Sequence, residues 1–120
     1  MLERGGRRIG IVGIDVAGKT KGSSSPDPGT VFLDEAATAQ AQVDLLRAEG
    51  VDIIVLLSHV GYQKDLELAK SLSGVDVVIG GDSHSLLGED FEEFGLAVEG
   101  PYPPRLVNRD GDTACVAQAW

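Results

Sequence analysis

The sequence of 120 residues contains few of the residues on which several common kinds of site depend. A single cysteine, Cys115, excludes an intrachain disulfide, a CxxC redox pair and a zinc ribbon. No apolar run approaches the roughly 20 residues of a membrane-spanning helix, and the start of the chain, Met1–Arg8, has no apolar stretch that reads as a signal peptide. Only 10 Lys and Arg stand against 19 Asp and Glu, for a formal net charge of -9, which argues against a binder of nucleic acid polymers.

What the sequence does contain is typical of one globular domain or part of one. Hydrophobic residues make up 42% of the chain and charged residues 24%, which are values of folded proteins. Short apolar runs predict buried strands at 9–14, 51–57, 75–79 and 113–120. Amphipathic spacing predicts one helix between Asp34 and Gly50 and a second around 66–72. This alternation predicts an α/β fold with parallel strands, whereas the Gly-, Ser- and Pro-rich residues 16–30 are expected to form a loop.

Residues Gly13–Thr20 match the pattern G-x-x-x-x-G-K-[ST] of a P-loop, which cradles phosphate on backbone amides. That mechanism needs a helix starting at Lys19 and Thr20, so that its first amides face the phosphate. The residues that follow, Lys-Gly-Ser-Ser-Ser-Pro, are poor at propagating a helix. A surface loop with a solvated lysine is therefore favoured, and a P-loop nucleotide-binding module stays open as an alternative function.

Gly81, Asp82 and Ser83 follow a predicted strand and resemble the nucleophilic serine block of GDSL-type esterases. Such chemistry needs a histidine base that takes the serine proton, and in those esterases the base lies near the C-terminus. No histidine follows His84 in this chain, so this interpretation is disfavoured.

Both histidines of the chain lie at or just beyond the end of a strongly apolar predicted strand. His59 follows the run 51–57, and His84 follows the run 75–79 through the residues Gly-Gly-Asp-Ser. If these strands are parallel neighbours, both loops meet at the carboxyl edge of the sheet, and an extended backbone would point Asp82 and His84 to the same side. Two imidazoles and one carboxylate would then form a ligand set for zinc, manganese or iron, although a solvated or capping histidine is an equally common outcome.

The residues around these histidines, at 57–61, 65–69 and 74–88, resemble the C-terminal half of a metallophosphoesterase (calcineurin-like) domain of the 5′-nucleotidase and NAD nucleotidase family. The resemblance extends from Ile9 to Trp120, nearly the whole chain, and it implies that residues 1–120 are the C-terminal portion of that domain. It implies an α/β fold that is a fragment of a four-layer α/β/β/α sandwich with two divalent metal ions, such as Zn or Mn. His59, Asp82 and His84 are then the metal ligands, with Asp82 in place of the usual histidine, and Gly81 and Ser83 shape the loop at the substrate.

The resemblance also implies an enzyme, a hydrolase that removes phosphate from nucleotides with a metal-activated water. The nucleotide is open between mononucleotides, NAD and sugar nucleotides. The blocks that would supply the remaining ligands have no counterpart before Ile9, and the substrate-binding C-terminal domain has none after residue 120. The chain is therefore expected to be an incomplete, inactive piece whose partner is the remainder of the same polypeptide, in a periplasmic or cell-surface protein. A non-catalytic α/β interaction domain is the other alternative.

Overall fold

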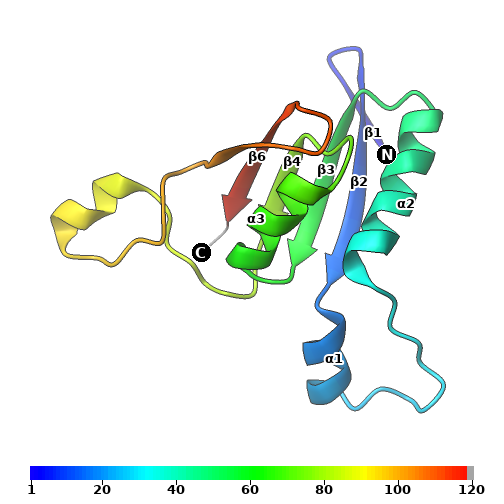
Figure 1. The fold of residues 1–120 in the computed structure, drawn as a ribbon, viewed down its shortest axis with the longest axis horizontal. Helices are drawn as coiled ribbons and strands as arrows, with labels where there is room; N and C mark the ends of the chain where they lie inside the picture. The colour runs from blue at the N-terminus through cyan, green and yellow to red at the C-terminus, as the bar shows by residue number, and fades with distance from the viewer. Residues whose placement is uncertain (119–120) are drawn as a thin grey trace.

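The computed structural model describes residues 1–118, in which six strands form one mixed sheet (Figure 1). The strands are β1 (Leu2–Arg4), β2 (Arg7–Asp15), β3 (Ile53–His59), β4 (Val77–Gly80), β5 (Arg105–Val107) and β6 (Thr113–Gln118). The helices are α1 (Ala17–Ser23), α2 (Glu35–Ala48) and α3 (Tyr62–Ser71), with a 3-10 segment η1 (Glu89–Phe94). The sheet order is β1-β2-β3-β4-β6-β5, with parallel pairing from β2 to β6 and antiparallel pairing at both edges.

The α/β prediction and the parallel pairing of the two histidine-bearing strands are confirmed. Asp34 caps α2 as predicted, because its carboxylate accepts from the amide of Ala37 at 2.8 Å. The strand predicted at 113–120 is β6 as far as Gln118, and its last two residues lie outside the described part. The edge strands β1 and β5 were not expected. β1 arises from the dipeptide Gly5-Gly6, whose two positive φ angles close a two-residue hairpin.

The prediction of a loop throughout residues 16–30 is wrong, because α1 occupies its first half. Its first amide, that of Ala17, donates to Glu35 Oε1 at 2.9 Å, and Thr20 Oγ1 donates to Asp15 Oδ2 at 3.0 Å. A carboxylate 18 residues away in sequence thus satisfies an amide that α1 leaves free. This tertiary contact stabilises a helix for which the local sequence gives little support.

Both long helices cover the same face of the sheet, and the core lies between them and the strands. A Cβ at Gly10 in β2 would meet Leu46 of α2, and one at Gly80 in β4 would meet Asp65 of α3. Both glycines share their face with the buried residues of the sheet, because side chains alternate along a strand. These buried sheet residues are Val12, Ile54, Leu56, Val78, Ala114 and Val116.

The opposite face of the sheet is apolar and open to solvent. Ile11, Leu57 and Ile79 point to it and are 47%, 52% and 38% exposed. Two rows of paired residues cross the four parallel strands on this side, and their side chains are without exception uncharged: Ile11-Val55-Val77-Cys115 and Gly13-Leu57-Ile79-Ala117. We call these eight residues the open face. None of the helices in residues 1–118 has the length and apolarity needed to cross a bilayer.

Candidate metal centre

The sheet brings two of the three predicted ligands into contact at its carboxyl edge. His59 is the last residue of β3, and Asp82 lies two residues beyond the end of the neighbouring strand β4. Asp82 Oδ1 is 3.5 Å from His59 Nε2. The Asp82 side chain is 17% exposed and the His59 side chain 63%, so an imidazole open to solvent lies against a largely covered carboxylate.

The loop that carries Asp82 and His84 is not extended, and the prediction that their side chains share one side on that basis is wrong. Asp82 has a φ of 76° and His84 a φ of 53°, so both adopt the left-handed conformation. Asp and His tolerate this region better than most residues, but each such residue still costs on the order of 1–3 kcal/mol. His84 is exposed and forms no ion pair with Asp82 in the described part of the chain.

Gly81 and Ser83, predicted to shape this loop, lie on either side of Asp82. A Cβ at Gly81 would stand 3.0 Å from His59 Nδ1, so a larger residue there would crowd the imidazole. Ser83 Oγ accepts a hydrogen bond at 3.0 Å from the amide of Tyr62, the first residue of α3. The Ser83 hydroxyl therefore fastens the loop to the N-terminus of that helix.

A lysine from another part of the chain reaches the same carboxylate. Lys19 of α1 donates from Nζ to Asp82 Oδ1 and forms an ion pair with it. This hydrogen bond, reinforced by the positive charge of Lys19 and the adjacent imidazoles of His59 and His84, lowers the pKa of Asp82 below its ordinary value, against the opposing effect of partial burial. The carboxylate is thus held ionised, which is the form that ligates a metal.

These residues fit part of a metal centre. The chemistry of His59 and Asp82, an imidazole nitrogen beside an ionised carboxylate oxygen, suits a divalent transition metal, and Lys19 shows that Asp82 accepts a cation. Residues 1–118 contain no group of three or more His, Cys, Asp and Glu side chains gathered as a metal site would require. A metal centred here would need further ligands beyond this pair.

The geometry disfavours a P-loop, although for a different reason than the sequence indicated. α1 provides a helix after the motif, contrary to the prediction, but Gly13 to Asp15 lie within β2 and pair with β3. Only Val16 separates the strand from the helix, so no loop remains to wrap around a phosphate. The lysine of the motif, Lys19, is engaged by Asp82.

Ser83 lacks the surroundings of an esterase nucleophile. The hydrogen-bond partners of its hydroxyl are the Tyr62 amide, Ser85 Oγ at 2.8 Å and Gln118 Nε2 at 3.3 Å. None of these is a histidine, so a base that would take the serine proton is missing from its contacts.

Sequence reasoning missed a set of buried oxygens directly behind this edge. Asp65 of α3 is fully buried, and both of its carboxylate oxygens lack a hydrogen-bond partner, as do Ser58 Oγ and Gln118 Oε1. Burial raises the pKa of Asp65 to about 6, and the nearby Ser58 hydroxyl, which stays outside hydrogen-bonding geometry, opposes this rise. The signal was available, because Asp65 lies three residues from Tyr62 and from Leu68 on the buried stripe of α3.

A histidine and a carboxylate meet beyond the ends of parallel strands in this α/β sheet. This carboxyl edge is where the functional sites of such sheets lie. No family model matches the chain. The chain is 40% identical over 121 residues to a probable 5′-nucleotidase of Treponema pallidum and 40% identical over 116 residues to an NAD 5′-nucleotidase of Haemophilus influenzae. These matches cover 100% and 96% of this chain but only 20% and 19% of the relatives.

Two solved structures agree with these relatives. The structure of the Haemophilus influenzae NAD nucleotidase matches with a TM-score of 0.94 and 38% identity, over 99% of this chain and 24% of that one. A 5′-nucleotidase precursor from Thermus thermophilus matches with a TM-score of 0.87 and 46% identity, over 97% of this chain and 22% of that one. The chain is therefore homologous to the 5′-nucleotidase and NAD nucleotidase family, and it spans about a fifth of the length of those proteins.

Proposed function

We propose that this chain is the C-terminal part of a metallophosphoesterase domain that hydrolyses phosphate esters or pyrophosphates of nucleotides. The observation that carries the proposal is the contact of His59 Nε2 with Asp82 Oδ1 at the carboxyl edge of parallel strands, in a chain homologous to 5′-nucleotidases. His59, Asp82 and His84 are this chain's contribution to a centre that the remaining ligands of the parent protein complete.

The residues of the chain have distinct tasks in that reaction. A divalent metal centre completed around these residues would supply an activated water and positive charge for the phosphoryl oxygens. Asp82, kept ionised by its surroundings, would supply carboxylate oxygens, and His59 would supply an imidazole nitrogen from the end of β3. Gly81 allows the loop to approach His59, and Ser83 anchors the loop to α3.

The open face supports the proposal that the chain is one part of a larger sandwich. Four parallel strands present uncharged, largely aliphatic rows to solvent, whereas parallel sheets in proteins are covered on both faces. A second sheet packed there, with its own outer helices, would complete a four-layer α/β/β/α arrangement. The missing N-terminal half and a separate substrate-binding domain would come from the polypeptide beyond this fifth of the relatives' length.

Binding of Mn²⁺, followed by paramagnetic broadening of backbone amide signals, tests the proposal. We expect broadening centred on residues 59 and 81–84, and its loss in His59→Ala and in Asp82→Ala, with Asp90→Ala in η1 as the matched control for removal of an exposed acid.

Lys19→Ala should strengthen Mn²⁺ binding, because the competing ammonium is removed from Asp82. A P-loop module would instead lose ATP binding with Lys19→Ala. Broadening spread evenly over acidic surface residues, unaffected by His59→Ala, would contradict the metal centre.

Activity provides the second arm of the test. The chain by itself should release no phosphate from AMP or NAD with Mn²⁺ or Zn²⁺ present, since it holds only part of the ligand set. Joined to the remaining sequence of its domain it should become active, and His59→Ala in that longer protein should abolish the activity. An active longer protein that tolerates His59→Ala would contradict the assigned role.

A further inference from the structure

The buried oxygens behind the carboxyl edge connect the segments that carry all three candidate ligands. Ser58 immediately precedes His59, and Ser83 separates Asp82 from His84. Asp65 lies near the Ser58 hydroxyl and, together with Gln118, against Gly80. Gln118 in turn donates to Ser83 Oγ at 3.3 Å.

Gly80 is the point where Asp65 and Gln118 come together. A Cβ built on Gly80 would collide with Asp65 Oδ2 and would stand 2.9 Å from Gln118 Oε1. Both oxygens are buried and have no hydrogen-bond donor. Two acceptors left unpaired in one buried place destabilise the fold, so a donor is expected between them.

Two arrangements of these side chains would supply a donor between Asp65 Oδ2 and Gln118 Oε1. In one, Asp65 carries the proton and donates it to Gln118 Oε1, while the Gln118 amide donates to Ser83. In the other, the amide of Gln118 is turned over, so that its NH₂ group donates to the ionised Asp65 and the Ser83 hydroxyl donates to Oε1. Both arrangements connect the buried carboxyl of α3 to the hydroxyl in the ligand loop through the side chain of Gln118.

The conformation of the ligand loop requires such a support. Asp82 and His84 are both left-handed, a conformation that persists only where the surroundings enforce it. Ser83, between them, is held by three partners: the Tyr62 amide, the hydroxyl of the buried Ser85 and the Gln118 amide. Of these three, Gln118 is the one that leads back to Asp65.

We propose that Asp65 and Gln118 are positioning residues, which form a polar bridge across Gly80 and fix the segment Asp82–His84 relative to α3. The role of the bridge in metal binding rests on the proposed function, whereas its role in fixing the loop does not. Outer partners of this kind usually change metal affinity about 10- to 100-fold when they are removed.

The experiment compares four variants of the chain by NMR and by Mn²⁺ binding. Gln118→Leu and Asp65→Val each remove one end of the bridge. Asp65→Asn has a side chain of the same shape, with one oxygen and one donor group, and should preserve the bridge. Gln42→Leu, on the exposed side of α2, is the matched control for Gln118→Leu. Because Gln118 is at the end of β6 and its replacement by leucine empties no core, the test does not depend on the folding of Asp65→Val.

We expect Gln118→Leu to shift the amide signals of residues 81–85 and the imidazole signals of His59 and His84, and to weaken Mn²⁺ binding about tenfold. Asp65→Asn and Gln42→Leu should leave the loop signals in place and the affinity within about threefold of the unmodified chain. Unchanged loop signals in Gln118→Leu would overturn the bridge, even if Mn²⁺ still binds. If the unmodified chain binds no Mn²⁺, the proposed function fails, and the loop signals still decide the bridge.

Discussion

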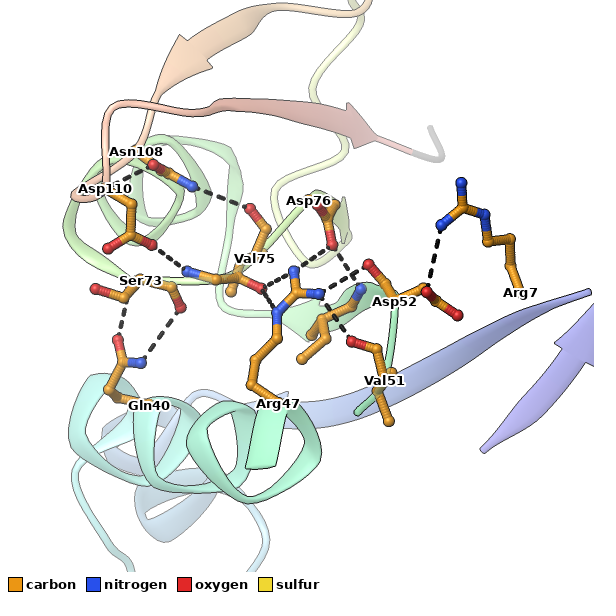
Figure 2. A network of polar contacts seen from close by, with 12 residues as sticks. Arg7, Gln40, Arg47, Val51, Asp52, Ser73, Val75, Asp76, Asn108 and Asp110 are labelled. Atoms are coloured by element: carbon orange, nitrogen blue, oxygen red, sulfur yellow. Dashed lines mark hydrogen bonds and ion pairs between the residues drawn. The ribbon is translucent and has the colours of Figure 1, made fainter. Parts of the chain in front are cut away.

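The two ends of the parallel strands carry polar networks of opposite character. At the amino ends of β3 and β4, Arg47 of α2 donates to the backbone carbonyls of Val51, Asp52 and Gly74 and to the carboxylate of Asp76, over 2.7–3.1 Å (Figure 2). At the carboxyl ends, Asp65, Ser58 and Gln118 retain oxygens with no donor, and Asp82 and His84 are left-handed. The first network is complete, and the second is strained and incomplete.

This difference distinguishes a structural network from a site. The amino end joins α2 to the starts of β3 and β4, and Asp76 also accepts from the Ile54 amide at 2.7 Å, so the polar groups there are used up within the chain. Local strain and unpaired buried groups persist in proteins chiefly where binding or catalysis needs them. The carboxyl end has both features, and it is the end where the candidate metal ligands lie.

The largest effect on stability is expected at the complete end. Arg47→Ala leaves three carbonyls and the Asp76 carboxylate without their shared donor and should lower the free energy of unfolding by about 2–3 kcal/mol. Urea unfolding measures it, and Gln42→Ala on the exposed side of the same helix is the control. A loss as small as that of the control would show that the network does not join α2 to the strands.

The next largest effect on stability is expected from a methyl group added at Gly80, at the carboxyl end of the strands. Gly80→Ala forces Asp65 away from β4 and should destabilise the chain by about 1–3 kcal/mol. Gly13→Ala on the open face is the matched control, because nothing lies within 4 Å of a Cβ there, and it should be neutral or slightly stabilising. Equal urea midpoints for the two variants would rule out the close packing of Asp65 on Gly80.

A smaller, pH-dependent effect should distinguish Asp65 from the acids of the amino end. Because burial raises its pKa from 3.8 to about 6, the folded state binds the Asp65 proton more tightly than the unfolded state does. The stabilisation from this proton is complete below pH 3.8 and is lost as the pH rises to about 6. Asp65→Asn should therefore gain stability relative to the unmodified chain across this window, in urea unfolding at several pH values, whereas Asp90→Asn serves as the exposed control. A constant difference between the two chains would contradict the raised pKa.

The smallest effect is expected at the rim of the amino end. Arg7 pairs with Asp52 at 3.3 Å, but its side chain is 68% exposed, and exposed pairs of this kind contribute little. Arg7→Ala should leave the urea midpoint unchanged within error. A clear loss of stability would show that the Arg47 network includes the Arg7–Asp52 pair at the sheet edge.

Much of the fold follows from local sequence patterns. The apolar β-branched runs that became β2, β3 and β4, and the capping carboxylate of Asp34, act through short-range chemistry that is visible in the sequence. The meeting of His59 and Asp82 could also be anticipated, since parallel neighbouring strands bring their carboxyl ends together.

What could not be predicted depends on contacts between distant segments. α1 is stabilised by Glu35 from the next helix, and the left-handed Asp82 and His84 are held by Ser83 and the residues around it. The burial of Asp65 behind the edge was readable as a carboxylate on an apolar stripe, but its neighbour Gln118 comes from a strand more than 50 residues later in the sequence.

The open face also sets how the chain should behave in solution. Eight uncharged positions on four strands invite stacking of one molecule on another, whereas a formal net charge of -9 drives molecules apart. Added salt shortens the reach of that repulsion to about 8–10 Å at ordinary ionic strength and leaves the attraction between aliphatic surfaces intact. A dilute low-salt buffer should therefore favour monomers, and concentrated salt should drive them into aggregates.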